Sequence, residues 1–153
     1  MPATKLTLQA TSFKRMQLND NDEYLHCYFY AEIHGIPEEL KDYNTNEAEL
    51  LSGEVEAETA LGIMLREPRM LHLATEPISL LASEVSYDKK KQTVTVSMDK
   101  AVGDGIYRGG ALLDTILQYR SEGGCDQRMY LEFELFVGVD PKILEELSAQ
   151  RRL

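Results

Sequence analysis

A strictly alternating segment near the C-terminus, YLEFELFV at residues 130–137, constrains the fold more than any other feature of the sequence. Successive side chains of a β-strand point to opposite faces of a sheet, so a period of two separates the residues of the two faces. One face of this segment is entirely apolar, whereas the other carries glutamates between aromatic residues. The segment therefore predicts a strand whose apolar face packs on a core.

Five further segments alternate more loosely or are rich in residues that favour strands. They are residues 6–16, 24–33, 70–74, 78–87 and 93–98. Turn residues at 19–22 join the first two segments into a predicted hairpin. A charged loop at 88–92 joins the last two into a second hairpin, so the expected sheet contains two hairpins and the strand at 130–137.

Three segments have the spacing or the boundary residues of helices. Residues 47–66 follow the capping signal Asn44-Thr45-Asn46, and Gly53 divides them into one interrupted helix or two consecutive helices. Residues 109–120 carry apolar side chains at helical spacing, and Asp140-Pro141 supplies the cap and first-turn proline of a terminal helix. The predicted fold class is α+β, with a mixed sheet packed against helices.

The 153 residues are sufficient for a single domain with one core. Within 1–153 we distinguish an N-terminal hairpin at 1–36, an acidic helical segment at 37–67 and a remaining core at 68–153. No apolar run approaches the roughly 18 residues of a membrane span, and the N-terminus lacks the pattern of a signal peptide. We therefore expect a cytoplasmic protein without a membrane partner.

The net charge of −10 disfavours broad contact with a phosphate backbone but is compatible with a local basic pocket. The acidic residues are concentrated at 38–67, where they greatly outnumber Lys41 and Arg66.

Cys27 and Cys125 are predicted to be free thiols. The spacing of the three histidines fits no metal site, so no metal ligand is assigned.

The stretch AVGDGIYRGGALL at residues 101–113 predicts a glycine-rich turn between a strand and a helix. Such a turn directs backbone N–H groups and the positive end of a helix dipole at one point, which suits an anion. Gly109 and Gly110 would let a ligand approach the main chain, and Arg108 would hold a phosphate or carboxylate. Asp104 fits a helix cap, a partner of Arg108, an acceptor for a ribose hydroxyl or a metal ligand. The pattern matches neither of the phosphate-binding motifs GxxxxGK[ST] and GxGxxG. A purely structural turn, with its glycines at positive φ, therefore remains an alternative explanation of the same residues.

The order of motifs after residue 65 resembles the N-terminal region of the abortive-infection phage-resistance (AIPR) family. The matching segments are LHLATEPISLLA at 71–82, VSYD at 85–88, GDGIYR at 103–108 and the strand region at 129–140. The family has an FHxxNxGI-like strand, a hairpin resembling LAxxVxYD and a DG[GQ]H[TR] turn before a helix. The resemblance implies a phage-defence function.

The Asp-Gly-x-x-Arg turn also resembles that of DGQHR-type proteins and, through them, the ParB/sulfiredoxin-like nucleotide-binding fold. This resemblance implies that Gly105 and Arg108 face a phosphate, and His72, Glu76 and Tyr107 are the residues expected to support the site.

The chain departs from the family at Thr75-Glu76-Pro77, where the family has Asn-[RN]-Gly, and at Tyr107, where it has histidine. Any nucleotide contact made by those family residues is altered here. Family members also continue into a further, largely helical region, so the chain is expected to be either an isolated domain or a reduced relative.

The expected ligand is a nucleotide with its Mg²⁺, or nucleic acid, bound at Asp104–Arg108 through phosphate; no resident cofactor is evident. An alternative is a non-catalytic interaction module or DNA mimic, in which residues 38–67 contact a basic protein. A homo-oligomer is a further expected partner state.

A hydrolase is a third alternative, in which Asp104 would gather with Glu76 or Glu132 around Mg²⁺. No catalytic residue is assigned, since the sequence offers no PD…ExK motif and no histidine base.

Overall fold

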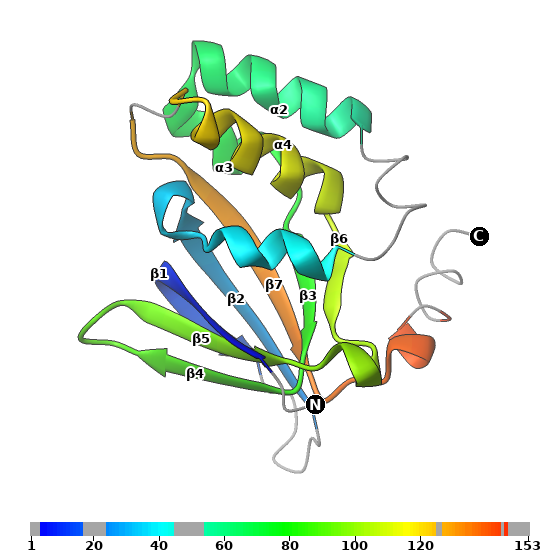
Figure 1. Ribbon diagram of the computed structural model, residues 1–153. Helices are drawn as coiled ribbons and strands as arrows, with labels where there is room; N and C mark the ends of the chain where they lie inside the picture. The colour runs from blue at the N-terminus through cyan, green and yellow to red at the C-terminus, as the bar shows by residue number, and fades with distance from the viewer. Residues whose placement is uncertain (1–3, 17–23, 45–53, 125–126, 145, 147–153) are drawn as a thin grey trace.

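The structure, a computed structural model, describes residues 4–16, 24–44, 54–124, 127–144 and 146 (Figure 1). Within these residues seven strands form one mixed sheet in the order β4-β5-β1-β2-β7-β3-β6, which confirms the α+β class. The strands are β1 (Thr4–Met16), β2 (Leu25–Glu32), β3 (Ile78–Ala82), β4 (Glu84–Asp88), β5 (Thr93–Met98), β6 (Gly105–Arg108) and β7 (Tyr130–Val137).

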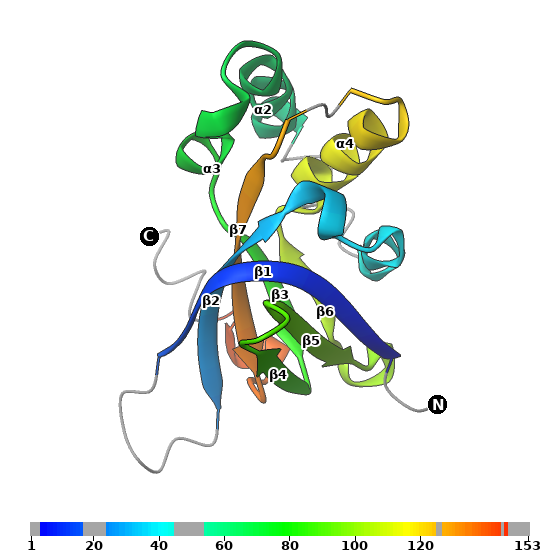
Figure 2. The same cartoon turned by 90° about the vertical axis from the view of Figure 1, so that its left-hand side faces the viewer.

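The helices α2 (Glu54–Arg66), α3 (Leu71–Ala74) and α4 (Gly110–Ser121) gather at one end of the sheet (Figures 1 and 2). Short 3-10 helices join the larger elements: η1 (Ile33–Gly35), η2 (Glu38–Tyr43), η3 (Pro68–Met70) and η4 (Lys100–Val102). No helix among the described residues is long and apolar enough to cross a membrane.

The strand predicted from the alternating pattern at 130–137 is confirmed as β7. It pairs with β2 in antiparallel register and with β3 in parallel register, and thus lies inside the sheet. Its apolar face is buried, with Phe133 fully enclosed and stacked on Phe29 of β2 at a ring separation of 5.3 Å. The opposite face of β7 is only half-buried, so the strand separates the core from a second face of the sheet, which we call the open face.

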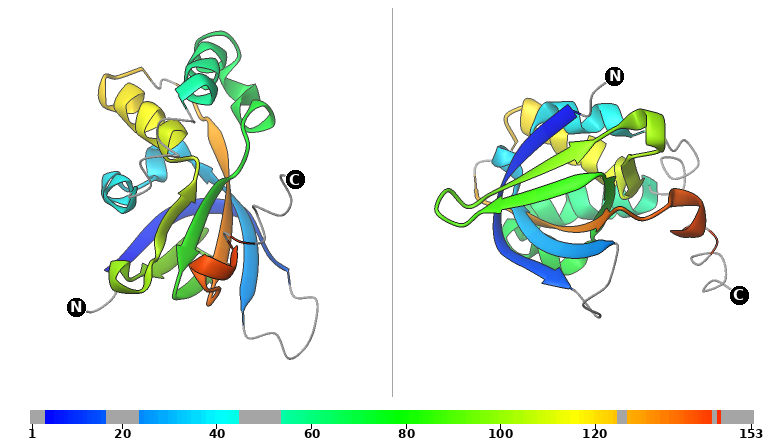
Figure 3. Two further views of the ribbon diagram at one scale, coloured as in Figure 1. Left: turned by 90° about the vertical axis from the view of Figure 1, so that its right-hand side faces the viewer. Right: turned by 90° about the horizontal axis from the view of Figure 1, so that it is seen from below.

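The sheet curves because β1 pairs with two different neighbours along its length. Residues 4–9 of β1 pair with β5, and residues 10–16 pair with β2 through an irregularity between Thr11 and Lys14, where Ser12 has φ of 57°. Strand β1 therefore arcs across the molecule, and the strands form a curved layer (Figures 2 and 3). A backbone bond from the Ser83 N–H to the Ser97 carbonyl, at 2.8 Å, ties β5 to the turn after β3.

Both predicted hairpins are confirmed: β1 pairs with β2, and β4 pairs with β5. Of the helical segment predicted at 47–66, the described residues form α2, and the helix predicted at 109–120 is present as α4. Residues 141–144 are helical after Asp140, whose side chain accepts a bond from the Lys142 N–H. The predicted turn at 19–22 and the helical residues before 54 lie outside the described residues.

Two strand predictions were wrong. Residues 70–74 are helical, as the end of η3 and α3, because within this described segment only Leu71 is buried and Pro68 begins a helical turn. Residues 78–87 form two strands instead of one, since β3 is buried on both faces whereas β4 lies at the sheet edge with alternating exposure. Short apolar runs do not distinguish strands from helices by periodicity alone.

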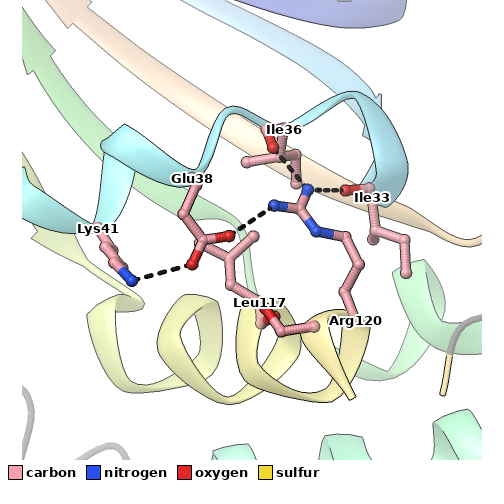
Figure 4. A network of polar contacts seen from close by, with 7 residues as sticks. Ile33, Ile36, Glu38, Lys41, Leu117 and Arg120 are labelled. Atoms are coloured by element: carbon pink, nitrogen blue, oxygen red, sulfur yellow. Dashed lines mark hydrogen bonds and ion pairs between the residues drawn. The ribbon is translucent and has the colours of Figure 1, made fainter. Parts of the chain in front are cut away.

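Arg120 of α4 links the helical layer to the turns that follow β2 (Figure 4). Its Nη1 donates to the carbonyl oxygens of Ile33 and Ile36, at 2.7 and 2.5 Å, and its Nη2 lies 3.1 Å from Glu38 Oε2. Glu38 also accepts a bond from Lys41 Nζ at 2.9 Å. One guanidinium thus satisfies two carbonyls at the ends of 3-10 turns and one carboxylate.

Replacing Arg120 with alanine is expected to lower the free energy of unfolding by about 2–4 kcal/mol, because the part-buried carbonyls of Ile33 and Ile36 lose a charged donor. Urea denaturation measures this loss. Arg66→Ala is the control, since Arg66 is exposed and its bond to the Gly62 carbonyl, within its own helix, is long at 3.4 Å. Equal losses in the two variants would contradict the linking role.

Hydrogen bonds from Lys41 and Arg120 lower the pKa of the Glu38 carboxyl. Its contribution to stability is therefore complete above the unfolded-state pKa of about 4.3 and is lost as pH falls through the lower folded-state pKa. We expect Glu38→Gln to reduce the acid-induced fall in stability that wild type shows in this window. Denaturant titrations at a series of pH values measure it, and identical pH slopes in both proteins would refute it.

Candidate functional site

The stretch 101–113 contains a strand where the sequence predicted a turn. Residues 105–108 form β6, an edge strand that pairs with β3. Asp104 precedes this strand, and Gly109 follows it as the N-cap of α4. Five steps of extended chain span roughly 16 Å, so Asp104 and the start of α4 lie at opposite ends of β6 and do not surround one point.

Asp104 makes local structural contacts. Its Oδ2 accepts a bond from Ser83 Oγ at 2.6 Å and from the Asp99 N–H at 2.9 Å. These bonds fix the η4 turn against the turn between β3 and β4. Asp104 therefore stabilises this turn, which is none of the four roles that the sequence left open, and the predicted cap of the helix is instead Gly109.

The glycines of the stretch are close to other parts of the chain. Gly105 has φ of 150°, and a Cβ there would lie 2.8 Å from the Tyr43 carbonyl oxygen. Gly109 has φ of 89°, and its Cβ would lie 2.9 Å from Ile78 Cγ1. A Cβ at Gly110 would overlap the Asn44 side chain. Internal packing therefore accounts for these three glycines without a ligand.

A row of polar side chains crosses the open face. Register pairs Lys14 of β1 with Tyr28 of β2, Tyr28 with Glu134 of β7, Glu134 with Ser79 of β3, and Ser79 with Arg108 of β6. Residues directly opposite each other on neighbouring strands share a face. We call these five residues the polar row.

Glu134 is the hub of the polar row. Its Oε2 accepts bonds from Tyr28 Oη and His26 Nε2, both at 2.9 Å, and its Oε1 accepts one from Ser79 Oγ at 2.9 Å. The His26 ring also stacks on Phe136 at 4.6 Å. These donors offset the negative charge of Glu134 and hold its carboxylate in one orientation.

Arg108 ends the polar row at the β6 edge and is half-buried. Among the described residues its guanidinium makes no hydrogen bond or ion pair, and its carbon lies 5.4 Å from the centre of the Tyr107 ring. Lys14, at the other end of the row, is exposed and likewise unpaired within that part of the chain. Within the described ranges the row therefore presents two free cations flanking one compensated carboxylate.

The three predicted supporting residues lie in different places. Tyr107 contacts Arg108 as described and sits where the β3–β6 register shifts. His72 of α3 meets Tyr30 of β2 edge-on, with ring centres 5.7 Å apart. The Glu76 N–H donates to Glu56 of α2 at 3.2 Å. Of the three, Tyr107 is the one that contacts the predicted phosphate residue.

Other candidate groups are dispersed or internally bonded. In the described part of the chain no three His, Cys, Asp or Glu side chains form a group that could hold a metal ion, so Asp104, Glu76 and Glu132 do not assemble one. Cys27 is a free, buried thiol; burial raises its pKa, and Arg15 opposes that shift. Cys125 lies outside the described residues.

The sequence did not identify Glu134 as a hub. Its alternating segment placed Glu134 on the polar face of β7, but the donors come from strands distant in sequence. Only the register between β2, β7 and β3 brings His26, Tyr28 and Ser79 to one carboxylate. The alternation of aromatic residues in β2 was the available signal that Tyr28 lies on the same face of the sheet as the other donors to Glu134.

Comparisons of the chain with protein-family models, with curated proteins and with solved structures found no match.

Gly109 provides a test of the packing explanation. Gly123 has a similar φ of 79°, but a Cβ there would meet no described atom within 4 Å. Alanine at either position incurs the cost of a left-handed backbone, about 1 kcal/mol. Gly109→Ala also forces Ile78 to move, which adds about 1–3 kcal/mol. Urea denaturation of both variants measures the difference, and equal stabilities would show that Gly109 is not required by packing.

Proposed function

We propose that the chain is a phosphate-binding domain of the phage-defence type, which recognises the phosphate of a nucleotide or nucleic acid through Arg108. The proposal is carried by one observation: Arg108, a half-buried residue at the end of the polar row, contacts the Tyr107 ring but has no hydrogen bond or ion pair among the described residues. Removing an arginine partly from water without an anion or a hydrogen-bond acceptor is unfavourable, and an external anion would supply that contact.

The surroundings of Arg108 favour an anion. Glu134 has its charge offset by three donors and forms no ion pair with Arg108 in the described residues. Helix α4 begins two residues later, and its N-cap Gly109 provides no side-chain cap. The positive end of a helix dipole close to an arginine adds to the attraction for phosphate.

The resemblance to the AIPR family and to ParB/sulfiredoxin-like proteins supports the same residue, because it places phosphate at the arginine of the Asp-Gly-x-x-Arg motif. Asp104 and Gly105 would then shape β6 and its approach without contacting the ligand. Tyr107, which replaces the family's histidine, would hold the guanidinium through its ring. We place this activity in the cytoplasm, where phage nucleic acid and nucleotides are found.

The net charge of −10 favours a local contact with one or a few phosphates over extended contact with a duplex. Glu132 also lies on the open face, two residues from Glu134. A ligand is therefore expected at the β6 end of the row, which carries Arg108 and lies two strands away from Glu132 on β7.

The alternative, an acidic interaction module at residues 38–67, ranks second. Two of its carboxylates are already bound within the molecule. Glu38 forms ion pairs with Lys41 and Arg120, and Glu56 accepts a bond from the Glu76 N–H. Residues 45–53 of this segment lie outside the described residues.

Isothermal titration with nucleoside triphosphates, with and without Mg²⁺, and with short single-stranded DNA tests the proposal. We expect Arg108→Ala to weaken binding by about 10–100-fold, equivalent to roughly 1.4–2.8 kcal/mol, because one charge-assisted contact is lost. Arg108→Lys should recover only part of the affinity, since lysine lacks the two-bond geometry.

Arg66→Ala is the matched control, because it removes the same charge from an exposed position on α2. If both arginine variants lost affinity equally, the effect would reflect net charge alone. Absence of binding by wild type at millimolar ligand would refute the proposed function.

A further inference from the structure

A second candidate site lies away from Arg108, at a cavity where α3 meets the open face. The cavity has a volume of about 300 Å³ and is lined by Thr11, Tyr30, His72, Leu73 and Tyr130. This volume is at the lower end of the range for small-molecule sites. We call it the ring cavity because most of its lining residues carry rings.

The ring cavity has walls suited to a flat ligand. Tyr30 and His72 stand edge-on at 87°, so they form two sides of a corner. Flat rings bind favourably to such walls by stacking and by edge contacts. The phenol oxygens of Tyr30 and Tyr130 have no hydrogen-bond partner within the described ranges and are free to contact polar atoms of a ligand.

A polar cavity of about 240 Å³ adjoins the ring cavity and shares Thr11 and Tyr130 with it. Its further lining includes Gln9, Gln92 and Arg128. Arg128 is exposed and makes no ion pair with any described residue. Gln9 and Gln92 add side-chain amide donors, so this cavity offers a free cation and neutral hydrogen-bonding groups from the described part of the chain.

Glu32 also lines the polar cavity, but its carboxylate is bound internally. Oε1 lies 2.7 Å from His34 Nδ1, and Oε2 accepts a bond from the His34 N–H at 2.8 Å. These contacts reduce the repulsion that Glu32 would exert on an anion near Arg128.

We propose that the two adjoining cavities form one binding site for a small ligand with a flat heteroaromatic ring and an anionic group, of the nucleoside monophosphate class. The ring occupies the corner between Tyr30 and His72, and the anionic group reaches Arg128. The site is separate from the proposed phosphate contact, because Tyr30 and Tyr130 lie on β2 and β7 whereas Arg108 lies two strands beyond β7.

Titrations with adenosine monophosphate, adenosine and inorganic phosphate test the ring and the charge separately. Aromatic NMR signals of Tyr30, Tyr130 and His72 report occupancy of the ring cavity. We expect the monophosphate and adenosine to shift these signals, with the monophosphate binding about tenfold more tightly, whereas phosphate alone leaves the ring signals unchanged. Benzoate forms a further arm: if it bound more tightly than the monophosphate, the assignment to the nucleoside monophosphate class would be overturned.

Arg128→Gln is expected to remove the tenfold preference for the monophosphate and to leave adenosine binding unchanged. Since Arg128 is exposed, this variant should fold normally. His72→Ala should weaken both ligands by several-fold, and Arg108→Gln should alter neither at this site. Failure of the Arg108 proposal therefore leaves this one intact.

Equal affinity of wild type for adenosine and the monophosphate would overturn the assignment of Arg128. Absence of shifts in the three ring signals with adenosine, the monophosphate and benzoate at about 10 mM, a concentration that detects even millimolar dissociation constants, would overturn the site itself.

Discussion

The pairing of β7 on both of its edges is the constraint on which the rest of the structure depends. Antiparallel bonds to β2 and parallel bonds to β3 join the N-terminal hairpin to the later strands. Because one face of β7 is entirely apolar, this register also sets where the core lies, with Phe133 against Phe29. A shift of one residue would exchange the two faces and expose that apolar set.

The same register creates the polar chemistry of the open face. Glu134 can lie on a half-buried surface because His26, Tyr28 and Ser79 reach it from two neighbouring strands. Since this carboxylate already has its donors, Arg108 at the end of the row has no anion to pair with inside the described part of the molecule. The compensation of Glu134 and the availability of Arg108 are thus two consequences of one arrangement.

The sequence predicts those elements whose own residues determine them. Alternation over 130–137 identifies β7, and charged or turn residues between alternating runs identify both hairpins. The predictions were wrong at 70–74 and 78–87, because neither segment has a clear period in its apolar residues. Only one residue is buried in α3, whereas every residue of β3 is buried. The glycines around residues 105–108 favour a turn in the sequence, yet pairing with β3 makes these residues a strand. The polar row forms only because strands that are distant in the sequence pair in a particular register, and a single sequence does not reveal that register.

The glycines show how one motif admits two physical explanations, a ligand opening and internal packing. The sequence favours Gly105 and Gly109 as openings for a ligand, whereas their missing side chains accommodate Tyr43 and Ile78. Close contact between Gly109 and Ile78 brings the start of α4 directly against β3, beside the Ser79–Arg108 pair. The packing therefore fixes the spatial relation between a helix N-terminus and an arginine that no described anion pairs with. A recognition role for the stretch, if it resides in Arg108, depends on glycines that need not touch the ligand, because they set the position from which the arginine acts.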